Sequence, residues 1–228
     1  MVHFHIITLF PEAIEPYVQS SMLGRAQKDK KIKVSFYNPR DYTKDKHRRV
    51  DRRPYGGGPG MVLEPESVLR AAENAIGKKR DVEVIFFSPS GKQFDSTMVK
   101  KLAKNPVRAR GRKRPTSNGT RHIVMIAGHY EGVDARVQKI LKAKSVSVGD
   151  YVLTGGELPA LIIVDAVARY VPGVLGKSES REDERVASPD VYTRPEVFEW
   201  KGKKYRVPKV LITGHHAKIE EWRAKRAK

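Results

Sequence analysis

Three glycines that could let a ligand approach the backbone closely lie between Ser147 and Ala160. Gly149, Gly155 and Gly156 give this stretch backbone freedom and let another group approach closely, which an ordinary turn would not need three times. Pro159 suits the first turn of a helix. The pattern predicts a ligand-binding loop at the start of a helix. The alternative is a tight turn that only leads into a core helix.

Two other predicted strand ends are of the same kind. Residues 82–87 are apolar and run into Ser88 and Pro89, and residues 122–127 are apolar and run into the turn 128–132. Strands that alternate with helices predict an α/β fold with a mostly parallel sheet, and such sheets bind ligands at the carboxyl ends of their strands. We therefore expect the three turns to converge on one ligand.

A few charged side chains in these turns and in the segments after them could act on a ligand. They are Glu131 in the turn 128–132, Arg169 near the end of the helix that follows Pro159, and the acids Glu182, Asp183 and Glu184. Each has an ordinary explanation, because acids in a linker are usually solvated and an arginine at a helix end often offsets the helix dipole.

Several common chemistries are excluded by what the motifs lack. The chain has no cysteine, and no histidine pair has the spacing of a zinc protease, so we expect no protein-held metal centre. Residues 56–60 are rich in glycine but lack the Gly-Lys-Ser/Thr ending of a nucleotide-binding P-loop. Serine-hydrolase and dinucleotide-binding motifs are absent as well.

The net charge of +19 is unevenly distributed. Residues 25–53 carry 12 Lys/Arg against 4 Asp, residues 100–122 carry 9 against none, and residues 191–228 carry 11 against 4 Glu. Such patches attract phosphate backbones, so nucleic acid is the favoured partner over an anionic membrane or mere solubility. The arginines beside the glycine loop 56–60 favour an RNA or substrate lid, and residues 105–121 are predicted to form an exposed basic insertion.

The remaining segments complete the predicted organisation. Pro11 is expected to open a helix that runs towards Gly24, residues 32–37 a strand, residues 66–76 an amphipathic helix, and residues 158–170 a helix buried on nearly every side. Residues 173–189 are the linker candidate, followed by a basic tail that is helical from Ala217. With no signal-peptide pattern and no apolar run of the ~20 residues a membrane span needs, we expect a cytoplasmic protein without membrane attachment.

Five motifs together resemble a known family. They are residues 52–61 (RRPYGGGPGM), 128–134 (GHYEGVD), 147–160 (SVGDYVLTGGELPA), 171–176 (VPGVLG) and 192–196 (YTRPE). In this order they are similar to the bacterial tRNA (guanine-N1)-methyltransferases of the SPOUT class, over residues 1 to about 223. The resemblance implies a trefoil-knotted α/β domain that binds S-adenosylmethionine in the knot, and a homodimer with active sites at the subunit interface.

The resemblance also implies roles for individual residues. The cofactor would be surrounded by Phe86, Phe87, Ser88, Pro89, Gly128, Glu131, Gly132, Val148, Gly149, Asp150, Tyr151, Val152, Leu153, Gly155, Gly156 and Pro159. Asp183, or Glu184 in an ungapped comparison, would be the base that deprotonates guanine N1; Arg169 would stabilise charge on O6, and Glu131 is a further catalytic candidate. RNA contacts are expected from Arg48, Arg49, Arg52, Arg53, Gly57, Gly58, Arg194 and His215.

The implied activity is methylation of N1 of guanine 37 in tRNA, with Mg²⁺ as a candidate second cofactor. The implied domains are a catalytic domain over 1–175, a linker over 176–190 and a reduced, mainly helical tRNA-binding domain over 191–228. The linker is shorter than in the family and lacks its Asp-Ser-Phe, and His129 stands where arginine is common. Two alternatives stay open: a non-catalytic RNA-binding module, and a SPOUT methyltransferase with another RNA target.

Overall fold

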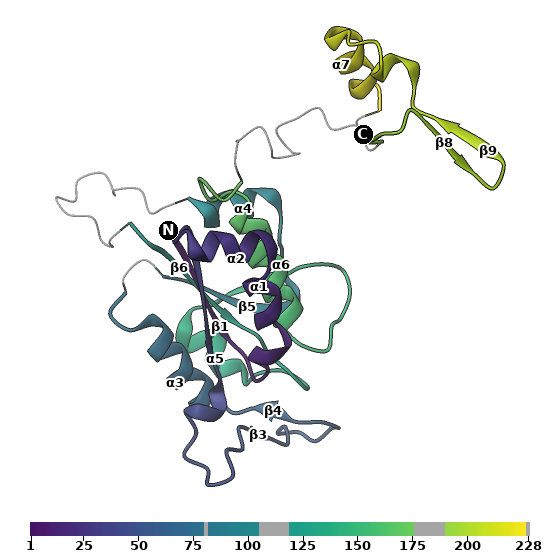
Figure 1. The fold of residues 1–228 in the computed structure, drawn as a ribbon. Coiled ribbons are helices and arrows are strands. Elements are labelled where there is room, and N and C mark those ends of the chain that lie inside the picture. The colour runs from purple at the N-terminus through teal and green to yellow at the C-terminus, as the bar shows by residue number, and fades with distance from the viewer. Residues whose placement is uncertain (80–81, 105–118, 176–189, 227–228) are drawn as a thin grey trace. The chain divides into compact units, whose positions relative to one another are not determined.

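The computed structural model describes residues 1–79, 82–104, 119–175 and 190–226 (Figure 1). The chain forms two compact units, Met1–Val174 and Leu175–Lys228, and each is described by itself. The linker acids Glu182, Asp183 and Glu184, and most of the basic insertion, lie outside the described residues. In the described part of the chain every helix is too short or too polar to cross a membrane.

The first unit is built on a five-stranded parallel sheet with the order β2-β1-β6-β5-β7. Its strands are β1 (Val2–Ile7), β2 (Ile32–Tyr37), β5 (Val82–Gln93), β6 (Arg121–Ile126) and β7 (Lys144–Ser147). The predicted mostly parallel α/β sheet is therefore confirmed. Because all five strands run the same way, their carboxyl ends lie at one edge of the sheet.

Helices cover both faces of this sheet, as Figure 1 shows. One layer consists of α1 (Glu15–Gln19), α2 (Ser21–Lys28), α4 (Ser96–Ala103) and α6 (Glu157–Ala168); the other of α3 (Pro65–Ile76) and α5 (Ala135–Leu141). Side chains alternate along each strand, so Phe4 and Ile123 pack under α6 while Ile7 and Val124 pack under α3. Two apolar cores thus hold the carboxyl edge rigidly.

The first helical segment differs from the prediction of a single helix ending at Gly24. The chain forms a short 3-10 turn, η1 (Pro11–Ala13), then α1 and α2, which are separated at Ser20, an extended residue (φ −95°, ψ 165°). Gly24 lies inside α2. A Cβ at this position would come within 2.1 Å of the Gln19 carbonyl oxygen. This glycine is needed for the close contact between α1 and α2, and it does not end a helix.

Two further expectations need correction. β5 continues to Gln93 through an irregularity between Phe87 and Lys92, where a turn had been expected. The helix α6 is not buried on nearly every side, since Leu158 and Ile162, four residues apart, are 55% and 39% exposed. One stripe of α6 is therefore apolar and faces solvent.

The second unit contains a β-hairpin as well as helix. Strands β8 (Val197–Trp200) and β9 (Lys203–Arg206) pair antiparallel, followed by the 3-10 turn η5 (Lys209–Leu211) and α7 (His216–Ala224). The ring of Trp222 on α7 contacts Tyr192 and lies under the guanidinium of Arg226. The helix from Ala217 was predicted, whereas the hairpin was not.

Candidate active site

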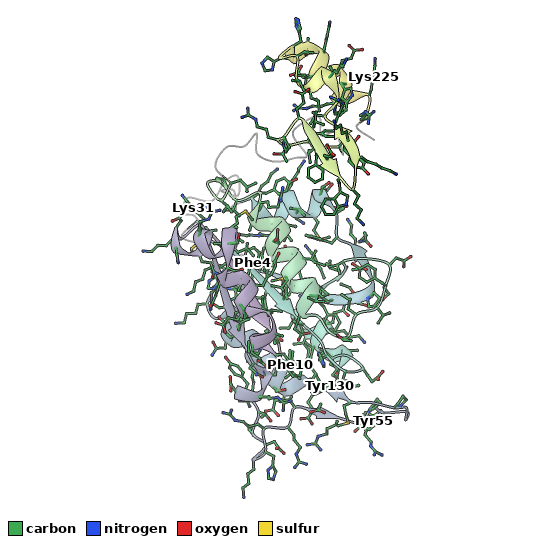
Figure 2. The ribbon with its side chains drawn as sticks, turned by 45° about the vertical axis from the view of Figure 1, so that its right-hand side comes forward. Phe4, Phe10, Lys31, Tyr55, Tyr130 and Lys225 are labelled. Carbon is green, nitrogen blue, oxygen red and sulfur yellow. The ribbon has the colours of Figure 1, made fainter. Side chains whose placement is uncertain are left out.

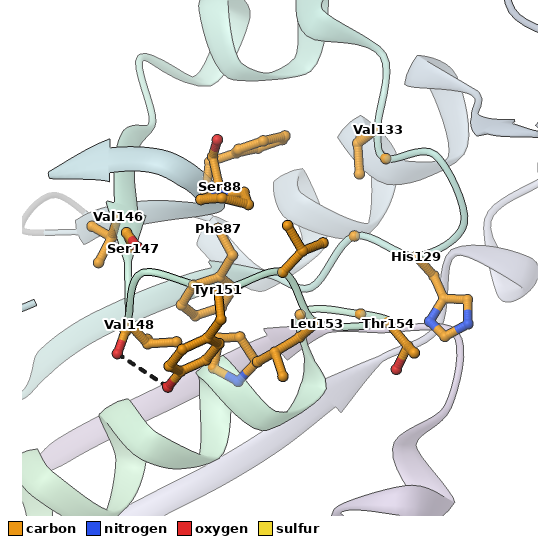
Figure 3. A pocket seen from close by; sticks show the side chains of 18 of the residues that line it. Phe87, Ser88, His129, Val133, Val146, Ser147, Val148, Tyr151, Leu153 and Thr154 are labelled. Atoms are coloured by element: carbon orange, nitrogen blue, oxygen red, sulfur yellow. Dashed lines mark hydrogen bonds between the residues drawn. The ribbon is translucent and has the colours of Figure 1, made fainter. Parts of the chain in front are cut away.

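The three segments that were predicted as turns at strand ends converge on one pocket at the carboxyl edge of the sheet (Figure 3), although the first of them, 86–89, belongs to the irregular part of β5. Its volume is about 340 Å³, which is within the usual range for a small-molecule site. The lining residues are Phe86 to Pro89, Gly128 to Val133, Val146 to Gly149, Tyr151 to Gly156, and Pro159. Fifteen of the sixteen residues expected around a cofactor are among them; Asp150 is exposed and does not line the pocket.

Backbone contacts between two of the turns fix the pocket floor. The N–H of Gly156 donates to the carbonyl of Gly128 at 2.8 Å, and His129 forms a bridge with Gly155. A Cβ on Gly156 would lie 2.5 Å from the Cα of Ala127. Glycine is therefore required at position 156 by the close approach of two backbones.

The loop after β7 is closed by its own hydrogen bonds. The Ser147 hydroxyl donates to the carbonyl of Gly149 at 2.8 Å, and the Tyr151 hydroxyl donates to that of Val148 at 3.4 Å, the bond drawn in Figure 3. The Tyr151 ring lies against Gly149, where a Cβ would come within 2.2 Å of it. These contacts place Val148, Tyr151 and Leu153 around one cavity.

A buried carboxylate ties this loop to the ends of β1 and β6. Glu157 is the first residue of α6 and is only 8% exposed. Thr8, just after β1, donates its hydroxyl to Glu157 Oε1 at 2.7 Å, and His129 Nδ1 lies 3.6 Å from Oε2. Neither Thr8 nor Glu157 was predicted to have a role. For Glu157 the sequence does contain an indication, since it is an acid directly after a glycine pair, at a helix N-terminus where an acid is favoured.

The pocket is almost free of charge. Among its lining residues Glu131 is the one with a formal charge, and its side chain lies against Gly60 of the glycine-rich loop. A site for a nucleoside triphosphate would present arginines or lysines to the phosphates. The arrangement suits a ligand that is mostly apolar or aromatic, can bond to backbone groups, and carries positive charge.

The arginine- and glycine-rich segment forms an arm attached to the pocket wall. It spans residues 48–63, and within it β3 (Asp51–Arg52) pairs with β4 (Val62–Leu63). The N–H of Glu131 donates to the Met61 carbonyl, and the N–H of Leu63 donates to the Gly132 carbonyl, both at 3.0 Å. Figure 2 shows Tyr55 of the arm and Tyr130 of the turn at the same end of the unit.

All four expected RNA-contacting arginines of this arm are exposed. Arg48 lies 3.6 Å from Asp41 and Arg49 lies 3.5 Å from Asp45, while Arg52 pairs with Glu64. Gly57 and Gly58, also expected to contact RNA, have φ of +82° and +113° and open space around them. Exposed surface pairs of this kind are weak, so the guanidinium groups can exchange a carboxylate for a phosphate.

The other predicted residues are not among those that line the pocket, or they fall outside the described part. Arg169 caps the C-terminus of α6, ten residues after Pro159 and therefore about 15 Å along the helix axis. Arg194 and His215 are exposed residues of the second unit. Arg121, expected in the basic insertion, instead begins β6 and pairs with Glu83 at 3.0 Å.

The hairpin of the second unit presents aromatic side chains to solvent. Phe198 pairs with Tyr205 and Trp200 with Lys203, so these four side chains share one face. The three aromatic residues are 52%, 55% and 59% exposed for Phe198, Tyr205 and Trp200, and the rings of Phe198 and Trp200 are nearly parallel at 14°. Exposed aromatic rings beside lysines are typical of surfaces on which nucleic-acid bases stack.

The chain is similar to known proteins of one family. The profile of the family described as tRNA (Guanine-1)-methyltransferase TrmD matches residues 2–228. A tRNA (guanine-N(1)-)-methyltransferase of Pseudoalteromonas atlantica is 43% identical over 98% of this chain and 79% of its own length. Enzymes of the same name from Dictyoglomus turgidum and Clostridioides difficile are 43% and 39% identical, over 100% and 97% of this chain and 85% and 90% of their own lengths.

The parallel α/β sheet with a pocket at its carboxyl edge defines a ligand-binding α/β protein. The full-length match shows that the chain belongs to the tRNA (guanine-N1)-methyltransferase family. The predicted family membership is confirmed. The roles assigned to single residues stay predictions.

Proposed function

We propose that this protein transfers a methyl group from S-adenosylmethionine to N1 of guanine 37 of tRNA, in the cytoplasm and as a homodimer. Family membership carries the reaction class. The observation that carries the site is the convergence of three segments, 86–89, 128–133 and 146–156, on one weakly charged pocket. The proposal includes the trefoil knot and the division into catalytic domain, linker and tRNA-binding domain.

The donor set of the pocket fits S-adenosylmethionine. The ligand is cationic at sulfur and at its amino group, and Glu131 is the one formally charged side chain of the lining. Phe87, Val146 and Leu153 offer apolar surface to an adenine ring, while the glycine-rich turns offer backbone groups to its nitrogens. When bound, the cofactor supplies a methyl group on a positively charged sulfur.

The protein must then make guanine N1 a nucleophile. N1 carries a proton at neutral pH, so a base has to remove it. We assign this base to Asp183, with Glu184 as the alternative. As the proton leaves, negative charge collects on O6, where the guanidinium of Arg169 can stabilise it.

The position of Arg169 supports a site shared by two subunits. About 15 Å of helix separates it from Pro159 in the pocket of the same chain. The stripe of Leu158 and Ile162 on α6 is apolar and exposed, and Leu158 directly precedes the pocket residue Pro159. If a second copy covered this stripe, its own Arg169 could reach the neighbouring pocket. Tyr17 borders the stripe by donating its hydroxyl to Asp165 at 2.7 Å, and this bond raises the pKa of Tyr17.

Contacts to tRNA are proposed from both units. In the first unit the arm of Arg48, Arg49, Arg52 and Arg53 is hydrogen-bonded through Leu63 and Met61 to the pocket wall. A movement of the arm on binding RNA would therefore also move Glu131. In the second unit the aromatic face of the hairpin, with Arg194 and His215, would hold unpaired bases and phosphates.

The decisive experiment maps the methylated nucleotide. The full chain is incubated with S-adenosylmethionine labelled in its methyl group and a tRNA transcript with guanine at position 37; we expect one label, at N1 of that guanine. A transcript with adenine at 37 is the matched control. Asp183→Asn and Arg169→Ala should keep tRNA affinity and lose methyl transfer. Wild-type rates in both variants would refute the assigned mechanism, and a label elsewhere would refute the target.

A further inference from the structure

Three histidines meet at the amino edge of the sheet, opposite the pocket. His3 and His5 are two residues apart on β1 and therefore share a face, and His122 of β6 lies directly across from His3. One ring nitrogen of each lies within 4.8 Å of the others. The N mark in Figure 1 stands at this end of β1. Six residues of β6 and the following turn, or roughly 20 Å, separate His122 from Gly128 in the pocket.

Two of the ring nitrogens have the spacing of ligands around one ion. His5 Nε2 and His122 Nδ1 are 3.1 Å apart. Two imidazole nitrogens bound to one tetrahedral Zn²⁺ would be about 3.3 Å apart, since each Zn–N bond is about 2.0 Å long. The His3 and His5 rings are stacked, with centroids 3.8 Å apart, so that the two side chains run together towards His122.

Each ring of β1 is also oriented by a hydroxyl of the neighbouring strand. Tyr37 Oη lies 3.0 Å from His5 Nδ1, and Ser35 Oγ lies 2.9 Å from His3 Nε2. Both hydroxyls belong to β2. Metal-binding histidines generally use the nitrogen that does not face the ion in such a bond, which fixes the ring and its tautomer. For His5, Nδ1 is held by Tyr37 and Nε2 faces His122.

Lys33 and Lys79 face the cluster and oppose a cation, so its affinity should be limited by their charge.

We propose that His3, His5 and His122 form a binding site for a late first-row transition-metal ion, such as Zn²⁺ or Co²⁺, with water completing the coordination. Imidazole ligands select these ions over Mg²⁺ and Ca²⁺, which prefer oxygen. The site is independent of the proposed methyl transfer. A metal centre was not expected, because the chain has no cysteine and no histidine pair with the spacing of a zinc protease. The third ligand lies 117 residues after His5, and only the pairing of β1 with β6 brings the two residues together.

The test uses the full chain without an affinity tag, freed of metal with EDTA and dialysed. We expect one Co²⁺ per chain, seen by its visible absorption bands, and displacement of Co²⁺ by Zn²⁺ but not by Mg²⁺. His3→Ala and His122→Ala should each weaken Zn²⁺ binding at least tenfold in calorimetry. His47→Ala, which changes an exposed histidine elsewhere, is the matched control and should bind as the wild type does.

A charge variant separates a metal site from a purely hydrogen-bonded cluster. Lys33→Gln removes one of the facing charges and should tighten Zn²⁺ binding several-fold. Unchanged Zn²⁺ affinity in this variant, wild-type affinity in either histidine variant, or no binding of Zn²⁺ to the wild type at about 1 mM would each overturn the proposal. The side chains of Tyr37, His5 and His122 would then form a hydrogen-bonded network and no metal site.

Discussion

Glu131 determines how the pocket can distinguish ligands by charge. It is the one formally charged residue in a lining otherwise made of backbone, apolar and neutral polar groups. Replacing it by glutamine keeps the shape of the side chain and removes the charge. We expect Glu131→Gln to weaken binding of S-adenosylmethionine several-fold, or on the order of 1 kcal/mol, because the pair is solvated.

Two comparisons make this prediction specific. S-adenosylhomocysteine lacks the sulfonium charge, so calorimetry should show a smaller loss for it if Glu131 acts on the sulfur. Asp150→Asn removes a neighbouring acid that does not line the pocket, and it should leave both affinities unchanged. Equal binding of S-adenosylmethionine by Glu131→Gln and the wild type would contradict the electrostatic role of Glu131.

At the scale of secondary-structure elements, one acid connects three neighbouring strands. Glu83 of β5 contacts Arg121 of β6 at 3.0 Å and also pairs with Lys144 of β7. The side chains of Glu83 and Arg121 are each only 15% exposed. Glu83→Ala would leave a partly buried guanidinium without its carboxylate, so we expect a loss of about 1–3 kcal/mol in the free energy of unfolding.

Urea denaturation measures this loss, and the chain offers a matched control. Glu66 on α3 also contacts two cations, Arg70 and Lys44, but all three side chains are well exposed. Glu66→Ala should therefore change stability little. If the two variants were equally stable, the three-strand contact at Glu83 would have no structural importance.

The elements that sequence patterns predicted best are those decided locally. Apolar runs ending in glycine-rich turns predicted β5, β6 and the loop after β7, because strand and turn preferences act over a few residues. The break between α1 and α2 was missed because it depends on the extended backbone of Ser20 and on the close approach of Gly24 to the Gln19 carbonyl, which the spacing of apolar residues does not show. The tie from Thr8 to Glu157 joins residues 149 positions apart and needs the fold to be known.

For the whole molecule, the exposed stripe on α6 predicts a dimer. Leu158 and Ile162 are large apolar residues one turn apart and accessible to solvent in the single chain. Ile162→Asp should shift the protein from dimer to monomer in sedimentation velocity. Ile140→Asp, at a 60% exposed residue of α5 in the other helical layer, is the control and should remain dimeric.

The same variant tests whether the two subunits share the active site. The pocket is lined by residues of one chain, so monomeric Ile162→Asp should still bind S-adenosylmethionine. It should lose methyl transfer, because Arg169 could no longer be supplied by a second copy. A monomer that methylates tRNA at the wild-type rate would show that each chain is complete.

The overall charge of +19 predicts that the affinity for tRNA depends strongly on salt concentration. Each phosphate neutralised by a lysine or arginine releases a bound counterion, so the logarithm of affinity should fall linearly with the logarithm of salt concentration, by about 0.7–0.9 per contact. Between low and physiological salt we therefore expect a steep loss of tRNA affinity in filter binding. Replacing Arg48, Arg49 and Arg53 together by glutamine removes three candidate phosphate contacts and should make this slope shallower by about 2 to 3.

Trp200→Ala is the control for the salt dependence. It should weaken binding at every salt concentration and leave the slope unchanged, because a stacked base releases no counterions. A slope near zero for the wild type would mean that the basic patches do not contact RNA phosphates.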